Sequence, residues 1–135
     1  MRYNEQVIKL DIDGADRRQW RHDFRRLRWL GEQVSDILSK NGPWIMLEPA
    51  YVATSKHGYH VRFNVVGGRL LDTEIVTVQS ILGSDPIREA LNLYRVRSGI
   101  VPWNYLFEVK EQDGTVTSRE HERRDILKLL RGKVH

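Results

Sequence analysis

The sequence predicts a single α+β domain over residues 1–135, with elements in the order β-α-β-β-α-α-β-α. Three observations predict this class: strand-like alternation at 7–13 and 58–68, a long amphipathic helical pattern between them, and capped helical patterns after them. Hydrophobic residues make up 40% of the chain and charged residues 30%, which is typical of a soluble folded domain. Because there is no cysteine, disulfides, thiolate metal sites and cysteine nucleophiles are excluded.

The first predicted strand, VIKLDID at 7–13, alternates apolar and charged residues as a strand with one buried face does. Asp11 and Asp13 then point to the same face. Two like charges held at this spacing repel each other, so we expect basic side chains, a metal ion or water to neutralise them.

A long helix is predicted next, with Asp16 as N-cap and Gln19 at the capping-box position. Its end is predicted at NGP, where Gly42 suits a left-handed cap and Pro43 cannot continue a helix. The apolar stripe expected to face the core consists of Trp20, Phe24, Leu27, Leu30, Val34 and Ile37.

The middle of the chain predicts two strands. Segment 44–55 is extended but interrupted by Pro49, which indicates a bent or edge strand. Segment 58–68 alternates apolar residues with His60, Arg62 and Asn64, so we expect one packed face and one open face.

The remaining segments predict two helices, a strand and a terminal helix. Asp72 is the expected cap of a helix at 70–83 that Gly83 closes. A second helix within 84–99 has Asp85 as its expected cap and Pro86 at its first position. A strand is predicted at 105–110, a turn at 113–114 and a helix at 118–132.

Without the additional helices, this order is the split βαββαβ arrangement of ferredoxin-like and RNA-recognition-motif (RRM)-like domains. In that arrangement the first and third strands are central neighbours, helices cover one face, and the other face is free. Glu108 of the last strand points to the free face if its apolar neighbours pack on the helices. The free face would then carry Asp11, Asp13, His60, Arg62 and Glu108.

Two motifs resemble the archaeo-eukaryotic primase superfamily of DNA primases and primase-polymerases. They are LDID at 10–13 and, after the long helix, SKHGYH at 55–60. The resemblance implies an RRM-like catalytic core in which Asp11 and Asp13 bind Mg²⁺ or Mn²⁺. Two such ions, roughly 3.5–4 Å apart, would stabilise the attacking and leaving oxygens of nucleotidyl transfer.

The second motif implies a site for the triphosphate of an incoming NTP or dNTP. The residues expected there are Ser55, Lys56 and His60, with Arg62 next on the same face. Backbone N–H groups at a glycine turn and cationic side chains suit phosphate oxygens. The alternative for Arg62 is that it only neutralises the two acids.

The sequence also departs from the superfamily pattern. A third acid is expected from a later motif, where this chain offers Asn92; Glu108 is our candidate, on strand geometry alone. The chain is short and has no cysteine zinc element. The resemblance therefore implies a minimal or virus-like member, a part that needs a second protein subunit, or a copy that binds without catalysing.

Basic residues crowd into the start of the long helix, which indicates a polyanion such as a DNA or RNA template as partner. The expected nucleic-acid-binding residues are Arg17, Arg21, Arg25 and Arg28. A plain solvated helix face is the alternative interpretation. Arg88, Arg95 and Arg97, on a later predicted helix, are expected to be surface charges, with a contact to the template as the alternative.

The sequence thus predicts a primase-like nucleotidyltransferase acting in nucleic-acid replication. One alternative is a non-catalytic nucleic-acid-binding module on an RRM-like scaffold; another is a metal-dependent nuclease, from the Glu-x-Lys at 108–110. With neither a signal peptide nor a membrane-length apolar run, we expect an intracellular, cytoplasmic protein without a membrane partner. The composition is compatible with an archaeal or viral source.

Overall fold

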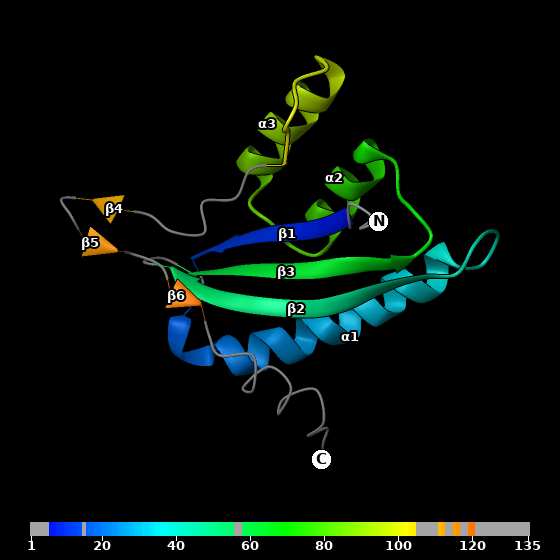
Figure 1. Ribbon diagram of the computed structural model, residues 1–135. Helices are drawn as coiled ribbons and strands as arrows, with labels where there is room; N and C mark the ends of the chain where they lie inside the picture. Colours follow the sequence, from blue (N-terminus) through cyan, green and yellow to red (C-terminus); the bar gives the residue numbers. More distant parts are fainter. Residues whose placement is uncertain are drawn as a thin grey trace, which may run out of the picture.

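The computed structural model describes residues 6–14, 16–55, 58–104, 111–112, 115–116 and 119–120 (Figure 1). Its elements are β1 (Gln6–Asp13), the 3-10 turn η1 (Arg17–Gln19), α1 (Trp20–Leu38), β2 (Ile45–Ser55), β3 (Gly58–Gly67), α2 (Asp72–Ile81), α3 (Pro86–Arg97), β4 (Glu111–Gln112), β5 (Thr115–Val116) and β6 (Arg119–Glu120). The α+β class is confirmed. The predicted strand at 105–110 lies outside the described residues.

The main sheet has the strand order β1-β3-β2-β6, and each neighbouring pair is antiparallel. The first and third strands are therefore neighbours, as predicted, but in the described part of the sheet β1 is an edge strand and not a central one. Register shifts in β2 between Pro49 and Tyr51, which agrees with the predicted interruption because proline has no N–H to donate.

The short strands lie near the end of the described chain. β4 and β5 pair on either side of residues 113–114, where the sequence predicts a turn. Arg119–Glu120 pair with β2 as a strand, so the helix predicted at 118–132 is wrong at these two residues. The rest of that helix lies outside the described residues.

One face of the sheet, here called the helix face, carries Ile8, Leu10, Val61 and Phe63, all buried. α1 runs along the β2 side of the sheet, while α2 and α3 lie on the β1 side (Figure 1). α1 comes close at Gly31, where an added Cβ would lie 3.2 Å from the Phe63 ring. Apolar residues of α1 and α2 share one core cluster with this face.

The predicted apolar stripe of α1 is confirmed except at Ile37. Trp20, Phe24 and Leu27 are buried, and the next two members, Leu30 and Val34, are partly buried and pack against the core cluster. Gly31 and Ser35 are the buried positions of the second half, and Ile37 is 65% exposed. The prediction for Ile37 is wrong because a residue two positions after Ser35 points to roughly the opposite side of a helix. Ser35 is buried because its hydroxyl accepts a hydrogen bond from Leu47 N, 2.9 Å away, in β2.

α1 also ends earlier than predicted, at Leu38, so the cap expected at Gly42 is wrong. Ser39 is the C-cap instead. Its hydroxyl accepts from Ile45 N at 2.9 Å and donates to Ile45 O at 3.0 Å, which turns the chain directly into β2.

The caps of the two later helices were predicted in part. Leu71, not Asp72, is the N-cap of α2, and its N–H donates to the Glu74 carboxylate at 2.7 Å. α3 begins as predicted, with Asp85 accepting from Arg88 N and Pro86 in the first turn. None of the helices among the described residues combines the length and the apolar character that crossing a bilayer requires.

Candidate functional site

The candidate site lies on the other face of the sheet, here called the polar face, which carries Lys9, Asp11, His60 and Arg62. Asp11 lies directly opposite His60 in the β1–β3 pairing. The Asp11 N–H points away from β3 and donates to Ser84 Oγ at 3.0 Å. Asp11 and His60 therefore form a non-hydrogen-bonded pair, in which facing side chains approach most closely.

Asp11 Oδ1 lies 3.6 Å from His60 Nε2. The structure thus brings the Asp-x-Asp strand and the histidine of the second motif together, as the sequence predicts. Gly58 contributes to this approach, because a Cβ at this position would overlap the carbonyl oxygen of Ile12. The glycine of SKHGYH lets β3 lie close against β1 at the motif.

Accessibility falls steeply along this face. Asp13 is exposed, the Asp11 side chain is 15% exposed, and His60 is completely buried. Ala53, opposite His60 on β2, is buried too. The prediction of an open face is therefore wrong at His60, and a ligand in this conformation meets the carboxylates before the imidazole.

The two cations of the polar face, Lys9 and Arg62, each contact a neighbouring group. The Arg62 guanidinium lies over the Tyr51 ring, 4.6 Å from its centroid. Lys9 Nζ donates to the carbonyl of Asn104 at 3.3 Å. Tyr51 was missed by sequence reasoning, because the register shift after Pro49 decides which face it joins.

A buried polar network, also missed, lies between α2 and α3. Glu89 is at its centre, and its Oε1 accepts from Gln79 Nε2 at 2.6 Å and Asn92 Nδ2 at 3.2 Å. Its Oε2 accepts from Ser84 Oγ at 2.7 Å and from the Arg88 guanidinium. Gln79, Ser84, Glu89 and Asn92 are all buried.

This network closes the outer edge of β1. Gln79 Oε1 accepts from Lys9 N at 2.9 Å, Ser84 Oγ accepts from Asp11 N, and Arg88 donates to Lys9 O at 3.1 Å. In a ferredoxin-like sheet, the last strand would pair with this edge. Over Lys9–Asp11, side chains from the α2–α3 region take those bonds instead.

Arg88 is mostly buried, so its prediction as a surface charge is wrong. Burial lowers the pKa of Arg88, while the carboxylates of Glu89 and Asp11 raise it. Arginine nevertheless stays charged in proteins. Asp11 therefore lies beside His60 and also interacts electrostatically with the buried guanidinium of Arg88.

The remaining expected residues of the nucleotide and metal sites are only partly within the described chain. Ser55 ends β2 opposite Gly58, while Lys56 and Glu108 lie outside the described residues. Among the residues that the structure describes, no cluster of three or more acidic, histidine or cysteine side chains is present. Asp11 and Asp13 are two carboxylates on one strand face.

The predicted arginine stripe lies on α1, across the sheet from the polar face. Arg21 and Arg25 are exposed, whereas Arg28 is partly buried and pairs with Glu32 at 3.4 Å. Arg17 falls in η1. The structure therefore does not bring these arginines together with Asp11.

Searches against protein-family models, curated proteins and solved structures found no match for this chain. The functional interpretation therefore depends on the residues and geometry described above.

Proposed function

We propose that this chain is a primase-like nucleotidyltransferase domain on an RRM-like scaffold, acting on a DNA or RNA template. The observation that carries the proposal is the pairing of Asp11 with His60 across β1 and β3, 3.6 Å apart on the face away from α1. The two motifs that suggest this chemistry are 40 or more residues apart in sequence and adjacent in space.

The carboxylates of Asp11 and Asp13 fit a magnesium or manganese ion. Mg²⁺ usually binds through one or two carboxylates together with substrate phosphates, and it keeps several waters. Two acids on one strand face therefore suffice for the protein's share of such a site. The ion would stabilise negative charge on the phosphoryl oxygens during transfer. Glu108 remains our candidate for a third acid.

The neighbours of the two acids support nucleotide binding in different ways. The buried imidazole of His60 supports Asp11 from behind, which makes it a positioning residue in the observed conformation. Arg62, also on the polar face, and Ser55 and Lys56 at the β2–β3 turn would bind the triphosphate of an NTP or dNTP.

A second candidate is the non-catalytic nucleic-acid-binding module. The outer side of α1 favours it, because Arg21, Arg25 and Arg26 are exposed beside Trp29, which is 59% exposed. Arginines bind phosphates, and an exposed aromatic ring stacks on bases. This surface would work without Asp11 or Asp13.

Calorimetry with NTP and Mg²⁺ or Mn²⁺ tests the first candidate. We expect Asp13→Ala and Asp11→Asn to weaken metal-dependent NTP binding at least about tenfold, or about 1.4 kcal/mol, because each loses a charged ligand. Asp36→Ala, an exposed acid on α1, is the matched control and should bind as the parent does. A thermal melt of each variant checks the fold.

Parent-like NTP affinity in the Asp11→Asn/Asp13→Ala double variant would contradict the nucleotidyltransferase proposal. The binding-only candidate predicts that outcome, together with single-stranded DNA affinity that falls steeply with salt. In that case Arg21→Ala and Arg25→Ala should each reduce the salt slope by about one.

A further inference from the structure

α3 has the reverse of the usual amphipathic pattern. Its inward side carries Glu89 and Asn92, both buried, and its outward side carries Ile87, Leu91 and Tyr94. These three, here called the α3 stripe, are 70%, 49% and 62% exposed. Their spacing of four and three residues places them in one row along the helix.

The α3 stripe belongs to a larger apolar surface. Leu93, Ile100 and Val101 are also exposed, at the same helix or just after its end. Together the six residues present apolar surface on the order of 600 Å², at the upper end of what monomeric proteins usually expose. α3 packs against α2 and projects away from the sheet, which leaves its outer side accessible (Figure 1).

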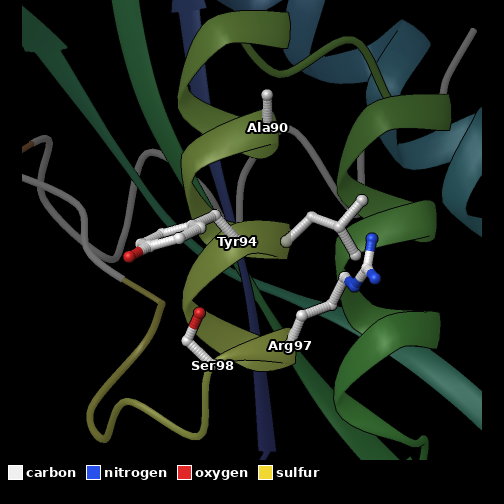
Figure 2. A pocket seen from close by; sticks show the side chains of 5 residues that line it. Ala90, Tyr94, Arg97 and Ser98 are labelled. Atoms are coloured by element: carbon white, nitrogen blue, oxygen red, sulfur yellow. The ribbon is translucent and has the colours of Figure 1, made fainter.

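A hollow adjoins the α3 stripe. Figure 2 shows Ala90, Tyr94, Arg97 and Ser98 along one side of the helix. With Leu93 they line a shallow cavity of about 480 Å³. A bulky apolar side chain from another helix could enter it beside the Tyr94 ring.

We propose that the α3 stripe is the interface of a homodimer, in which α3 packs antiparallel on α3 of a second copy. A twofold axis close to Leu91 would bring Ile87 of each copy to the hollow beside Tyr94 of the other. In the commonest protein dimers, two copies are related by a twofold axis and use the same surface patch.

Charge complementarity favours a second copy over an unrelated protein. The same axis places the exposed Arg97 of one copy near Asp85, the N-cap residue of α3 in the other copy. The antiparallel arrangement also brings each negative helix end to a positive one. Because Leu93 lies on a different side of α3 from Leu91, two such surfaces would bury at most on the order of 1,200 Å², the lower limit for a specific interface, so we expect a weak, reversible dimer.

Dimerisation would also stiffen the edge that holds Asp11. The segment leading into α3 contributes Asp85 N, which donates to Asp11 O at 2.7 Å, and Ser84 Oγ, which accepts from Asp11 N. The interface and the polar face are thus joined through one short segment.

Sedimentation velocity over a wide range of protein concentration tests the proposal. We expect a monomer–dimer equilibrium in the parent, and Leu91→Arg should raise its dissociation constant at least about tenfold because two cations would meet at the axis. Ile37→Arg, at a position of α1 that is 65% exposed, should leave the equilibrium unchanged. Both sites are exposed, and thermal melts check that both variants fold.

Cross-linking gives an independent readout, because the chain contains no cysteine. Under mild oxidation, Leu91→Cys should form a covalent dimer much faster than Ile37→Cys, since a disulfide needs its Cβ atoms within about 4.5 Å. A parent chain that remains monomeric into the upper micromolar range would overturn the proposal and leave the surface to a different protein. A dimer that Leu91→Arg does not weaken would overturn it as well.

Discussion

α1 and α3 are both well-formed helices with caps, yet they bury opposite kinds of residue. α1 buries Trp20, Phe24 and Leu27 and leaves most of its charged residues in solvent. α3 buries Glu89 and Asn92 and leaves apolar residues outside. The difference follows from what each helix packs against.

α1 covers the helix face of the sheet, where apolar side chains need apolar partners. α3, together with α2, closes the edge of β1, where unpaired backbone N–H and C=O groups need polar partners. Burial therefore selects for polar side chains at a strand edge and for apolar ones on a sheet face. The two helices allow identical substitutions to be compared in opposite environments.

Replacing a glutamate on each helix should give the largest difference in stability between the two sites. We expect Glu89→Ala to lower the free energy of unfolding by about 3–5 kcal/mol, because it leaves Arg88 and the buried amides without their acceptor. Glu32→Ala removes only a partly exposed ion pair on α1, which is worth about 0.5 kcal/mol or less. Urea unfolding measures both.

The midpoint and the slope of those unfolding curves must be compared together, since a change in slope would mean an altered unfolded state. Similar losses for Glu89→Ala and Glu32→Ala would contradict the view that α3 is held by its buried network. Glu89→Gln tests the charge alone, because it keeps the shape and one acceptor oxygen.

Leucine truncation should give the reverse contrast between the helices. Leu27→Ala opens a cavity in the core beneath α1 and should lower the free energy of unfolding by about 2–5 kcal/mol. Leu91 on α3 is half exposed, so Leu91→Ala should lower the free energy of unfolding of the monomer by less than about 1 kcal/mol. Thermal unfolding at low protein concentration, where the chain is monomeric, measures each.

Much of the fold could be predicted from local sequence. The alternation in β1 and β3, the α1 stripe as far as Val34 and the cap at Asp85 depend on near neighbours in the chain, and all were predicted correctly. Ile37 and Gly42 were misplaced because Ser35 and Ser39 bond to β2, and those contacts arise only once the sheet is present.

The candidate site was predictable in its pairing but not in its surroundings. Asp11 and His60 could be paired from strand order alone. The edge network could not, because Gln79, Ser84 and Glu89 read as ordinary helix and turn residues until β1 lies beside them. Burial of His60 likewise depends on packing across the sheet.

We expect the smallest change in stability from the hydrogen bond that links Tyr59 of β3 to the chain just before α1. The Tyr59 hydroxyl donates to Asp16 O, just before α1, and its pKa is raised mainly by burial and then by Asp23 and Asp16. An unfolded tyrosine ionises near pH 10, whereas the folded one keeps its proton to higher pH. Tyr59 thus contributes stability that is complete below about pH 10 and is lost as the pH rises above it, by at most about 1.4 kcal/mol per pH unit.

Tyr59→Phe should therefore cost about 0.5–1.5 kcal/mol at neutral pH through the lost hydrogen bond, and its disadvantage should shrink above pH 10. Tyr94→Phe, on the exposed side of α3, is the matched control and should unfold as the parent does at a protein concentration where the chain is monomeric. Urea unfolding at several pH values between neutrality and the alkaline range measures both. If the gap between Tyr59→Phe and the parent stayed constant above pH 10, the buried hydroxyl would not be what ties the start of α1 to β3.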